Sequence, residues 1–302
     1  MSGAIDVALD VPRMRHMSIG MTAYAEELAR RLPRVAPDLR FLTLQRHAAP
    51  GFDEQVRLPL RLLRLRPRLT HFLAVYAPLA APRPFVITIH DLIHLRYPEL
   101  FKRTIGPYYA TVVRAVCARA ARVITDDDRT IADLERFLGV APRKVAVIAL
   151  GVDEAFAQPV VAATEPRPYF LYVGNHRPHK DLPTLFAAWA SLAPSFQVDL
   201  LLTGPDDLER EAQPAERAGG RVRFLGDVDA AHLARLYKGA VALVHPALCE
   251  GFGLPLLEAA TVGTRVIVSS DAVPAVLRPY VEVFPTRDVR ALGAAMARAV
   301  AQ

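Results

Sequence analysis

The sequence has little cysteine, little lysine and no long uninterrupted apolar run. Its two cysteines, Cys117 and Cys249, are far apart in 302 residues, which argues against a disulfide framework and fits a reducing compartment. No apolar run approaches the ~20 residues of a membrane-spanning helix. Asp6 and Asp10 lie where a signal peptide would need an apolar core. We therefore predict a cytoplasmic protein, and a peripheral place at the inner face of a membrane stays open.

The composition is that of a globular protein that binds anions. Hydrophobic residues make up 52% of the chain, which is enough for a sizeable core. The formal charge of +6 favours anionic partners such as nucleic acid, acidic lipid or a phosphorylated metabolite. The basic residues are not interleaved with aromatic residues as in a nucleic-acid module, so we expect no nucleic-acid partner. Only four of the 37 basic residues are lysines, which makes a lysine beside an anion site more noticeable.

Short apolar runs alternate with stretches of helical periodicity, which is typical of parallel α/β sheets. In the first half we expect strands near residues 5–9, 41–44, 85–90, 122–125 and 145–148, and helices at residues 22–32, 102–119 and 129–138. In the second half we expect strands near residues 169–173, 199–203, 222–225, 241–245, 265–269 and 281–284, and helices at residues 182–192, 230–237, 255–261 and 287–300.

A proline-rich stretch separates the two alternating arrays. Pro159, Pro166 and Pro168 lie close together in a segment with little periodicity, which indicates a linker. We therefore predict an α/β protein of two Rossmann-like domains with parallel sheets that face each other across a cleft, at residues 1–160 and 161–302. Ligands of such open sheets lie at the carboxyl ends of the strands.

Residues 245–258 carry the richest set of candidate functional groups. An apolar strand ends at His245, glycines follow, and a proline begins a helix. Glycines allow close approach of a ligand, and a helix N-terminus offers unpaired N–H groups, so a diphosphate fits there. Glu258, in the first turns of the helix, can reach ribose hydroxyls, and Glu250 can hold a sugar hydroxyl or a developing positive charge. A capped helix, with Glu258 complementing its dipole, is the alternative interpretation.

A second candidate lies between residues 169 and 182, where a strand runs into Gly174 and a basic turn. Arg177 and Lys180 can clamp phosphate oxygens of a leaving nucleoside diphosphate, and Asp181 suits the N-cap of the next helix. A solvated basic turn is the competing explanation.

Two further candidates lie in the first half of the chain. His90 and Asp91 end a buried strand, where His90 suits a substrate hydroxyl and Asp91 either orients it or caps the next turn; a hydrogen-bonded core histidine is the alternative. Gly20 lies in the turn before the helix at residues 22–32, and alone it is a weak signal.

Together these segments resemble the retaining glycosyltransferases of family 4, of the group 1 type, which have the GT-B fold. The resemblance depends above all on CEGFGLPLLEA, which places Glu250 and Glu258 at a specific spacing, and it covers nearly the whole chain. Further matching motifs are YVGNHRPHKDL, TIHDL, LGVD and VRFLGDV. The variant around His90 is similar to that of bacterial mannosyl- and rhamnosyltransferases of cell-surface polysaccharides.

The resemblance implies roles for the matched positions. Glu258 would hold the donor ribose, and Glu250 and His90 would contact the transferred sugar. The diphosphate would lie against Lys180 and the glycine loop formed by Gly251, Phe252, Gly253 and Leu254, with Gly20 near the diphosphate or acceptor. The donor would be a GDP-, UDP- or dTDP-hexose with a mannose-like or rhamnose-like sugar, and the acceptor a glycan or a lipid-linked glycan. No cofactor or divalent metal would be needed, because basic residues and a helix terminus neutralise the leaving group.

Three departures from the family pattern leave an inactive, glycosyltransferase-like partner subunit as an alternative. Asn175 stands where the family often has arginine, so Arg177 would have to substitute for it. Asp127 replaces a common serine. The chain stops at Gln302 without the C-terminal segment that usually crosses back to the first domain.

A metal-dependent transferase of the GT-A fold is the rival enzyme interpretation. Asp126, Asp127 and Asp128 follow a strand and could bind Mg²⁺ or Mn²⁺. Aspartate also favours helix N-termini, and we favour capping of the helix at residues 129–138.

Residues 57–69, from Arg57 to Leu69, form a basic, leucine-rich stretch. Such a stretch can rest on anionic lipid, which would suit a lipid-linked acceptor. Pro59 and Pro67 limit any helix there. An equal alternative to membrane contact is that the apolar stems of the arginines cover the edge of the domain.

Overall fold

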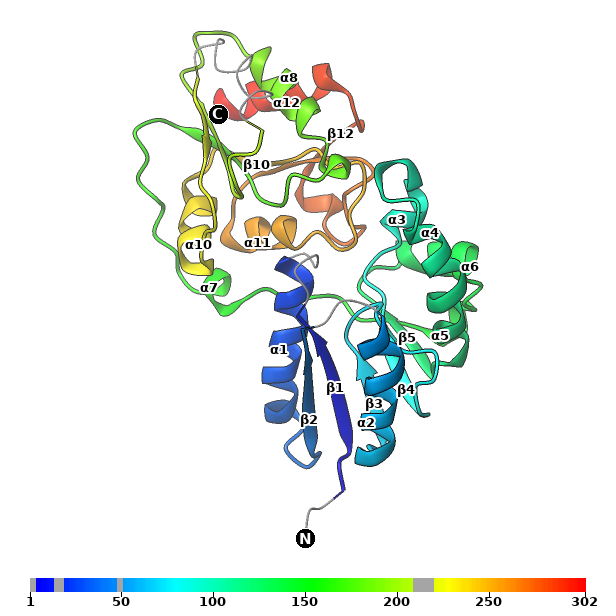
Figure 1. Ribbon diagram of the computed structural model, residues 1–302. Helices are drawn as coiled ribbons and strands as arrows, with labels where there is room; N and C mark the ends of the chain where they lie inside the picture. Colours follow the sequence, from blue (N-terminus) through cyan, green and yellow to red (C-terminus); the bar gives the residue numbers. More distant parts are fainter. Residues whose placement is uncertain (1–3, 14–18, 48–50, 209–219) are drawn as a thin grey trace. The chain divides into compact units, whose positions relative to one another are not determined.

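Two parallel sheets, each in its own half of the chain, make up the protein (Figure 1). The computed structural model describes residues 4–13, 19–47, 51–208 and 220–302. The chain divides into two compact units, Met1–Ala149 and Leu150–Gln302. Residues 158–168, which include the expected boundary at residues 160 and 161, form neither helix nor strand. Among the described residues, no helix is both long and apolar enough to cross a membrane.

The first sheet has the strand order β2-β1-β3-β4-β5-β6, and every pair of neighbours is parallel. Its strands are β1 (Val7–Pro12), β2 (Phe41–Arg46), β3 (Leu69–Phe72), β4 (Phe85–Thr88), β5 (Arg122–Thr125) and β6 (Val145–Val147). Apolar strand residues such as Ala8, Leu9, Phe85 and Ile87 are buried, because helices cover both faces of the sheet.

One helix covers one face of this sheet and the remaining helices cover the other (Figure 1). Among the described residues, α1 (Ile19–Val35) is the helix that packs on its face of the sheet. The other face carries α2 (Leu58–Leu65), α3 (Ile93–Arg96), α4 (Ile105–Tyr108), α5 (Arg114–Arg119) and α6 (Arg129–Leu138). A π-helical turn (Tyr109–Val113) joins α4 and α5, so the expected helix at residues 102–119 is a composite.

The second sheet has the order β12-β11-β10-β7-β8-β9, again parallel throughout. Its strands are β7 (Tyr169–Tyr172), β8 (Asp199–Leu202), β9 (Val222–Phe224), β10 (Ala242–His245), β11 (Val266–Ser269) and β12 (Glu282–Phe284). Because the order reverses between β7 and β10, the loops that follow these two strands flank the position where ligands of open sheets bind.

Helices cover both faces of the second sheet as well. Helices α8 (Leu182–Ala190) and α12 (Val289–Val300) lie side by side on one face (Figure 1). The other face carries α7 (Glu154–Ala157), α10 (Ala230–Gly239) and α11 (Leu254–Val262).

The structure corrects the sequence analysis at two places in the first unit. The strand β3 was not expected, because LTHF is short. Helix α2 forms between Pro59 and Pro67: a π-helical turn (Asp53–Arg57) leads directly into it, Pro59 lies in its first turn, and Arg66 ends it in a left-handed conformation. The prolines therefore bound this helix and do not prevent it.

Candidate donor-binding site

The two loops that flank the strand-order reversal in the second unit are joined directly. β7 leads through Gly174 to a short 3-10 turn (Pro178–Lys180), and β10 leads from His245 to the glycine loop. The backbone N–H of Leu248, in the second loop, donates to the carbonyl of His179, in the first, at 2.8 Å. This bond holds the basic turn against the glycine loop, so the two segments singled out in the sequence form one site.

Lys180 and Glu250 meet at the centre of this site. Lys180 Nζ lies 2.5 Å from Glu250 Oε2, and both side chains are largely buried, with 8% and 16% exposed. Burial by itself would raise the pKa of Glu250, but the Lys180 ammonium and the hydrogen bond from His245 outweigh it and hold that pKa well below its usual range. Glu250 is therefore an anion in the folded protein, and Lys180 neutralises it.

His245 is the third member of this cluster and was not expected to take part. Its Nε2 lies 3.2 Å from Glu250 Oε2, and its ring stacks on Tyr172 with 6.3 Å between centroids. Burial lowers the pKa of His245, although the nearby carboxylate partly opposes this. A carboxylate only accepts hydrogen bonds, so the neutral ring carries its proton on Nε2 and donates it to Glu250. The sequence offered one indication of this role, which is that His245 is the last residue of an apolar strand.

The glycine loop leads into α11 through a backbone conformation that needs glycine. Gly253 is the N-cap residue of α11 with φ of 80°. A Cβ there would lie 3.0 Å from Leu256 Cδ1 and 3.3 Å from Glu250 Cγ, so a side chain would press on the catalytic candidate itself. Gly251 and Phe252 are buried beside it. Leu254 begins the helix; Pro255 has no N–H, and the N–H groups of Leu256 and Leu257 donate to the Gly253 carbonyl at 2.9 and 3.3 Å, which leaves the N–H of Leu254 as the donor at this helix terminus.

Glu258 lies one turn into α11 and is held by a residue of a different helix. Tyr237 of α10 donates its hydroxyl to Glu258 Oε2 at 2.9 Å. Burial raises the pKa of Glu258 to about 7, against a contribution from Tyr237 that lowers it, and Asp153 raises it further. Nothing in the sequence pattern linked Tyr237 to Glu258, because the pairing depends on how α10 and α11 pack.

Two other residues of the basic turn take different places. The Arg177 side chain is exposed, and its backbone N–H donates to Asn175 Oδ1 at 3.3 Å. Its role as a phosphate clamp stays a prediction. Asp181 is the N-cap residue of α8, as expected, with φ of 51°, and it accepts a hydrogen bond from the Thr184 hydroxyl at 2.7 Å.

His90 lies in the first unit, two residues beyond β4, and is oriented by a residue that the sequence analysis assigned elsewhere. Its Nδ1 lies 2.5 Å from Asp126 Oδ2, at the end of the neighbouring strand β5. Tyr24 approaches the same ring edge-on, with centroids 4.5 Å apart. Asp91 does not take this role; it accepts from the backbone N–H of Ile93 and caps α3. The bond to Asp126 fixes the Nδ1–H tautomer, which leaves His90 Nε2 as an acceptor when the ring is neutral.

A second layer of side chains supports this arrangement. The Tyr24 hydroxyl lies 3.2 Å from Thr88 Oγ1, which lies 2.9 Å from His71 Nε2. Burial, with a smaller effect of His90, lowers the pKa of His71 to about 4, so His71 is neutral near pH 7. Within the described residues, His90 Nε2 is buried without a hydrogen-bond partner. It is therefore available to accept a hydrogen bond from a hydroxyl. Gly20 is exposed in the first turn of α1, and its place near the diphosphate or acceptor stays a prediction.

We expect Asp126→Ala to lower kcat by about tenfold or more, because His90 then loses the partner that fixes its tautomer. The direct readout is ¹⁵N NMR of the His90 ring, which should shift from Nδ1–H toward Nε2–H in the variant. Asp127→Ala is the matched control: Asp127 Oδ1 accepts from the backbone N–H of Arg129, so its loss should cost about 1 kcal/mol of stability and leave the tautomer unchanged. An unchanged His90 spectrum in Asp126→Ala would refute the positioning role.

The aspartates at residues 126–128 do not form the acidic motif of the rival interpretation. Asp126 bonds to His90, and Asp127 bonds to the backbone and the guanidinium of Arg129, each at 2.8 Å. The carboxylate of Asp127 thus caps the start of α6, as the preferred interpretation expected. The two parallel sheets also exclude the GT-A fold that the rival reading requires.

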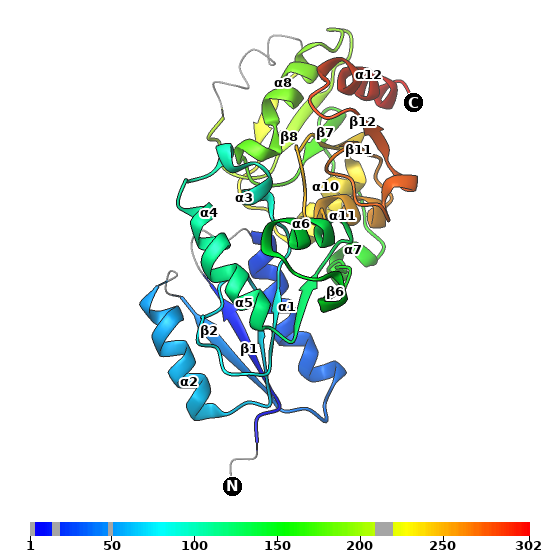
Figure 2. The ribbon, with the colours of Figure 1, turned by 90° about the vertical axis from the view of Figure 1, so that its right-hand side faces the viewer.

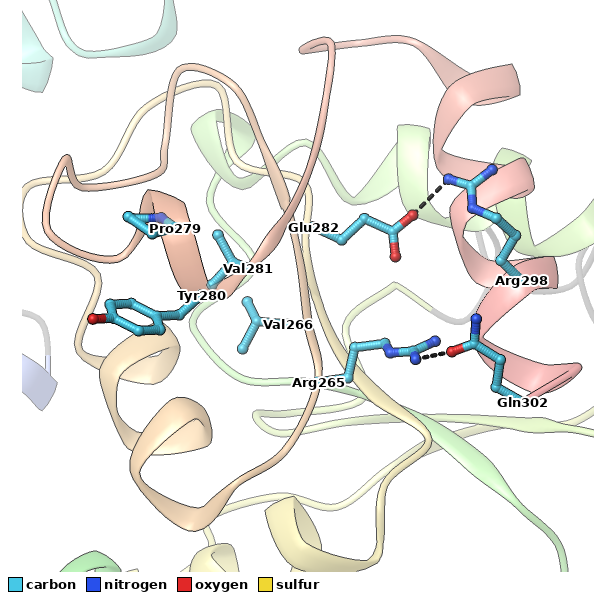
Figure 3. A pocket seen from close by; sticks show the side chains of 8 residues that line it. All are labelled: Arg265, Val266, Pro279, Tyr280, Val281, Glu282, Arg298 and Gln302. Atoms are coloured by element: carbon cyan, nitrogen blue, oxygen red, sulfur yellow. Dashed lines mark hydrogen bonds and ion pairs between the residues drawn. The ribbon is translucent and has the colours of Figure 1, made fainter.

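A crevice of about 340 Å³ lies elsewhere in the second unit, at the amino ends of β11 and β12 (Figure 3). Arg298 Nη2 pairs with Glu282 Oε1 at 2.5 Å, and Arg265 pairs with Gln302, so its arginines are held by the chain itself. The donor-site residues lie at the opposite, carboxyl ends of the strands. This crevice is therefore separate from the donor site.

Two family models match successive parts of the chain. Residues 19–156 match "Glycosyltransferase Family 4", and residues 167–302 match "Glycosyl transferases group 1". The chain belongs to the family 4 glycosyltransferases.

Named relatives of this glycosyltransferase include bacterial mannosyl- and rhamnosyltransferases. It is 28% identical to the O-antigen chain mannosyltransferase RfbU of Salmonella typhimurium over 61% of the chain and 51% of the relative. It is 30% identical to the D-rhamnosyltransferase WbpZ of Pseudomonas aeruginosa over 67% of the chain and 51% of the relative. The chain thus spans about half the length of these relatives.

Solved structures agree on the fold of this glycosyltransferase. Sucrose-phosphate synthase from Thermosynechococcus elongatus is 19% identical with a TM-score of 0.76, over 98% of this chain and 90% of that one. The Anabaena protein Alr3699/HepE in complex with UDP and glucose is 16% identical with a TM-score of 0.73, over the same shares. At these identities the likeness establishes the GT-B fold, with two Rossmann-like halves, as the sequence predicted.

Proposed function

We propose that this chain is a retaining hexosyltransferase that moves a sugar from a nucleotide-sugar donor to a glycan or lipid-linked acceptor. The observation that carries the proposal is the buried Lys180–Glu250–His245 cluster, which lies beside the N-terminus of α11 with Glu258 one turn further on. A cation, an anion and a helix terminus at the reversal of strand order are what a sugar diphosphate needs.

Different groups of the site bind different parts of the donor. The diphosphate lies against the start of α11, near Gly253 and the N–H of Leu254. Lys180 has three N–H donors, so it can keep its bond to Glu250 and donate to a phosphate oxygen at the same time. Glu258 accepts hydrogen bonds from both ribose hydroxyls once it is ionised. The positive charge of Lys180 and of the N-terminus of α11 thus lies next to the leaving diphosphate. Negative charge develops on that diphosphate as the glycosidic bond breaks.

The sugar lies on the other side of the diphosphate, next to the carboxylate of Glu250. Glu250 accepts from sugar hydroxyls and stabilises positive charge at the anomeric carbon in the transition state. In the first unit, Asp126 keeps the proton of His90 on Nδ1, so His90 Nε2 accepts a hydrogen bond from a substrate hydroxyl. Retention then follows from attack on the face from which the diphosphate departs, without a protein nucleophile.

The sugar is a mannose-like or rhamnose-like hexose, carried by GDP, UDP or dTDP, in cell-surface polysaccharide synthesis. The relatives named as mannosyl- and rhamnosyltransferases support this substrate class, and the structural neighbour in complex with UDP and glucose supports a nucleotide donor.

A thermal-shift screen of nucleotide hexoses tests the donor, and NMR of the product's anomeric configuration tests retention. We expect one donor to raise Tm clearly above its free diphosphate, and the product to keep the donor's configuration. An inverted product would overturn the mechanism. Donor binding with no transfer to any tested acceptor would instead indicate the inactive partner subunit.

Activity is expected to survive excess EDTA, because Lys180 and the N-terminus of α11 supply the positive potential that a metal would otherwise provide. Transfer rates with EDTA, and with added Mg²⁺ or Mn²⁺, should agree within error. Loss of activity on chelation and its return with Mn²⁺ would contradict this prediction.

A further inference from the structure

The outer side of α2 carries an apolar ridge that folding does not explain. Phe52, Val56, Leu60 and Leu63 expose 67%, 39%, 51% and 56% of their surface. They run from the π-helical turn η1 (Asp53–Arg57) into α2 at intervals of four, four and three residues, which places them on one helical face. We call these four residues the outer ridge. Figure 2 shows α2 at the margin of its unit, away from α1.

The opposite face of the same segment already packs into the core. Glu54, Leu58 and Leu62 are buried, at the same helical spacing. A helix at the surface of a globular unit is ordinarily polar on its outer side. Here both sides are apolar, and four large apolar residues gathered on the outer side indicate a contact outside the chain.

Arginines border the outer ridge. Arg57, Arg61 and Arg64 follow one another at turn intervals along one flank, and Arg66 and Arg68 follow the end of α2; all five are exposed. Asp53 pairs with Arg57 and Asp6 pairs with Arg68, each at 3.2 Å, and Glu54 is buried. The arginines of this border outnumber these two acidic partners. The surface therefore combines an apolar ridge with a strongly basic border.

We propose that the outer ridge and its arginines lie in the headgroup region of an anionic bilayer. Apolar side chains in the acyl boundary and arginines at the phosphates are the arrangement of a helix that lies in the membrane plane. A second copy of the chain does not fit, because two such basic surfaces would repel each other. The Arg57 guanidinium lies over the Phe52 ring, 5.7 Å from its centroid, but arginine stems do not cover Leu60 and Leu63, which are more than half exposed.

This surface is separate from the donor site, and its test needs neither donor nor acceptor. Sedimentation with phosphatidylcholine vesicles, with and without phosphatidylglycerol, measures the partition coefficient. We expect binding to the anionic vesicles that weakens with salt. Leu60→Ser with Leu63→Ser should weaken it by about tenfold or more, because both side chains lose their place in the acyl boundary. Arg61→Gln with Arg64→Gln should weaken it by about tenfold as well. The control Leu39→Ser, at another exposed leucine of this unit, should bind like the parent.

A fluorescent reporter distinguishes insertion from loose attraction. The chain's one tryptophan, Trp189, is buried, so Phe52→Trp adds a single exposed indole. Its emission should shift to the blue with anionic vesicles, while that of Leu39→Trp should not. Absence of parent binding, equal binding by the Leu60/Leu63 variant, or a dimer that this variant dissolves without any vesicle binding would each overturn the proposal.

Discussion

Glu250→Gln is expected to lower kcat by roughly 10²-fold or more, the scale of one preorganised electrostatic contact at the reacting centre. The substitution keeps the size of the side chain and an acceptor oxygen but removes the charge that faces the sugar. That charge matters most when the anomeric carbon becomes cationic, so kcat falls while binding of the sugar-free diphosphate changes little. Lys180, released from its 2.5 Å bond to the carboxylate, remains available to the phosphates.

The same substitution is also expected to destabilise the protein, for a reason that the sequence did not reveal. Glu250 neutralises a buried ammonium, and removal of one partner of such a pair leaves the other unpaired at a cost of up to roughly 3 kcal/mol. Adding Lys180→Met to Glu250→Gln should therefore restore part of the free energy of unfolding.

The measurements are steady-state transfer rates, calorimetry with the free nucleoside diphosphate, and denaturant unfolding of both single variants and the double variant. A loss of diphosphate affinity as large as the loss in kcat would identify Glu250 as a support of the glycine loop. Normal turnover would remove it from the mechanism.

Local sequence patterns were sufficient for most of the fold. The glycine loop at Gly253 and the helix after it follow from a residue that needs positive φ and a proline in a first turn, and both are local properties. Strand β3 was not predicted, because its four residues include one threonine and one histidine and show no distinctive hydrophobic period. Helix α2 was left open because its prolines were weighed as breakers before their positions relative to its ends were known.

The sequence predicted many of the residues of the site, but it did not predict which of them pair with one another. Lys180 and Glu250 were assigned to opposite ends of the donor, yet the fold joins them in an ion pair because β7 and β10 are neighbours in the sheet. Asp126 was weighed as a metal ligand or helix cap, yet it orients His90 across neighbouring strands. Such pairings depend on strand order and helix packing, which spacing along the chain does not contain.

Glu258→Gln is expected to stabilise the free protein above neutral pH and to weaken nucleotide binding. Burial raises the pKa of Glu258 from 4.5 to about 7. Between those values the folded protein holds a proton that the unfolded chain has released. The contribution of Glu258 to stability is therefore complete below the lower value and is lost as the pH rises through the upper one. Glutamine carries no charge and still accepts from Tyr237, so the variant escapes this loss.

The expected gain in the free energy of unfolding is about 1–3 kcal/mol near pH 8 and close to zero near pH 4. The affinity for the nucleoside diphosphate should move in the opposite direction and fall by about tenfold or more, because the carboxylate can accept from both ribose hydroxyls at once and the amide cannot. In the parent protein, nucleotide binding should strengthen as the pH rises toward 7 and should release a proton below pH 7.

Denaturant unfolding at both pH values, together with calorimetry in two buffers of different ionisation enthalpy, measures each effect. A variant that is less stable near pH 8 would mean that Glu258 supports the packing of α10 on α11. Unchanged affinity would place the ribose elsewhere. Higher stability with weaker binding would show that the fold keeps a buried carboxylate at a cost because the donor ribose requires it.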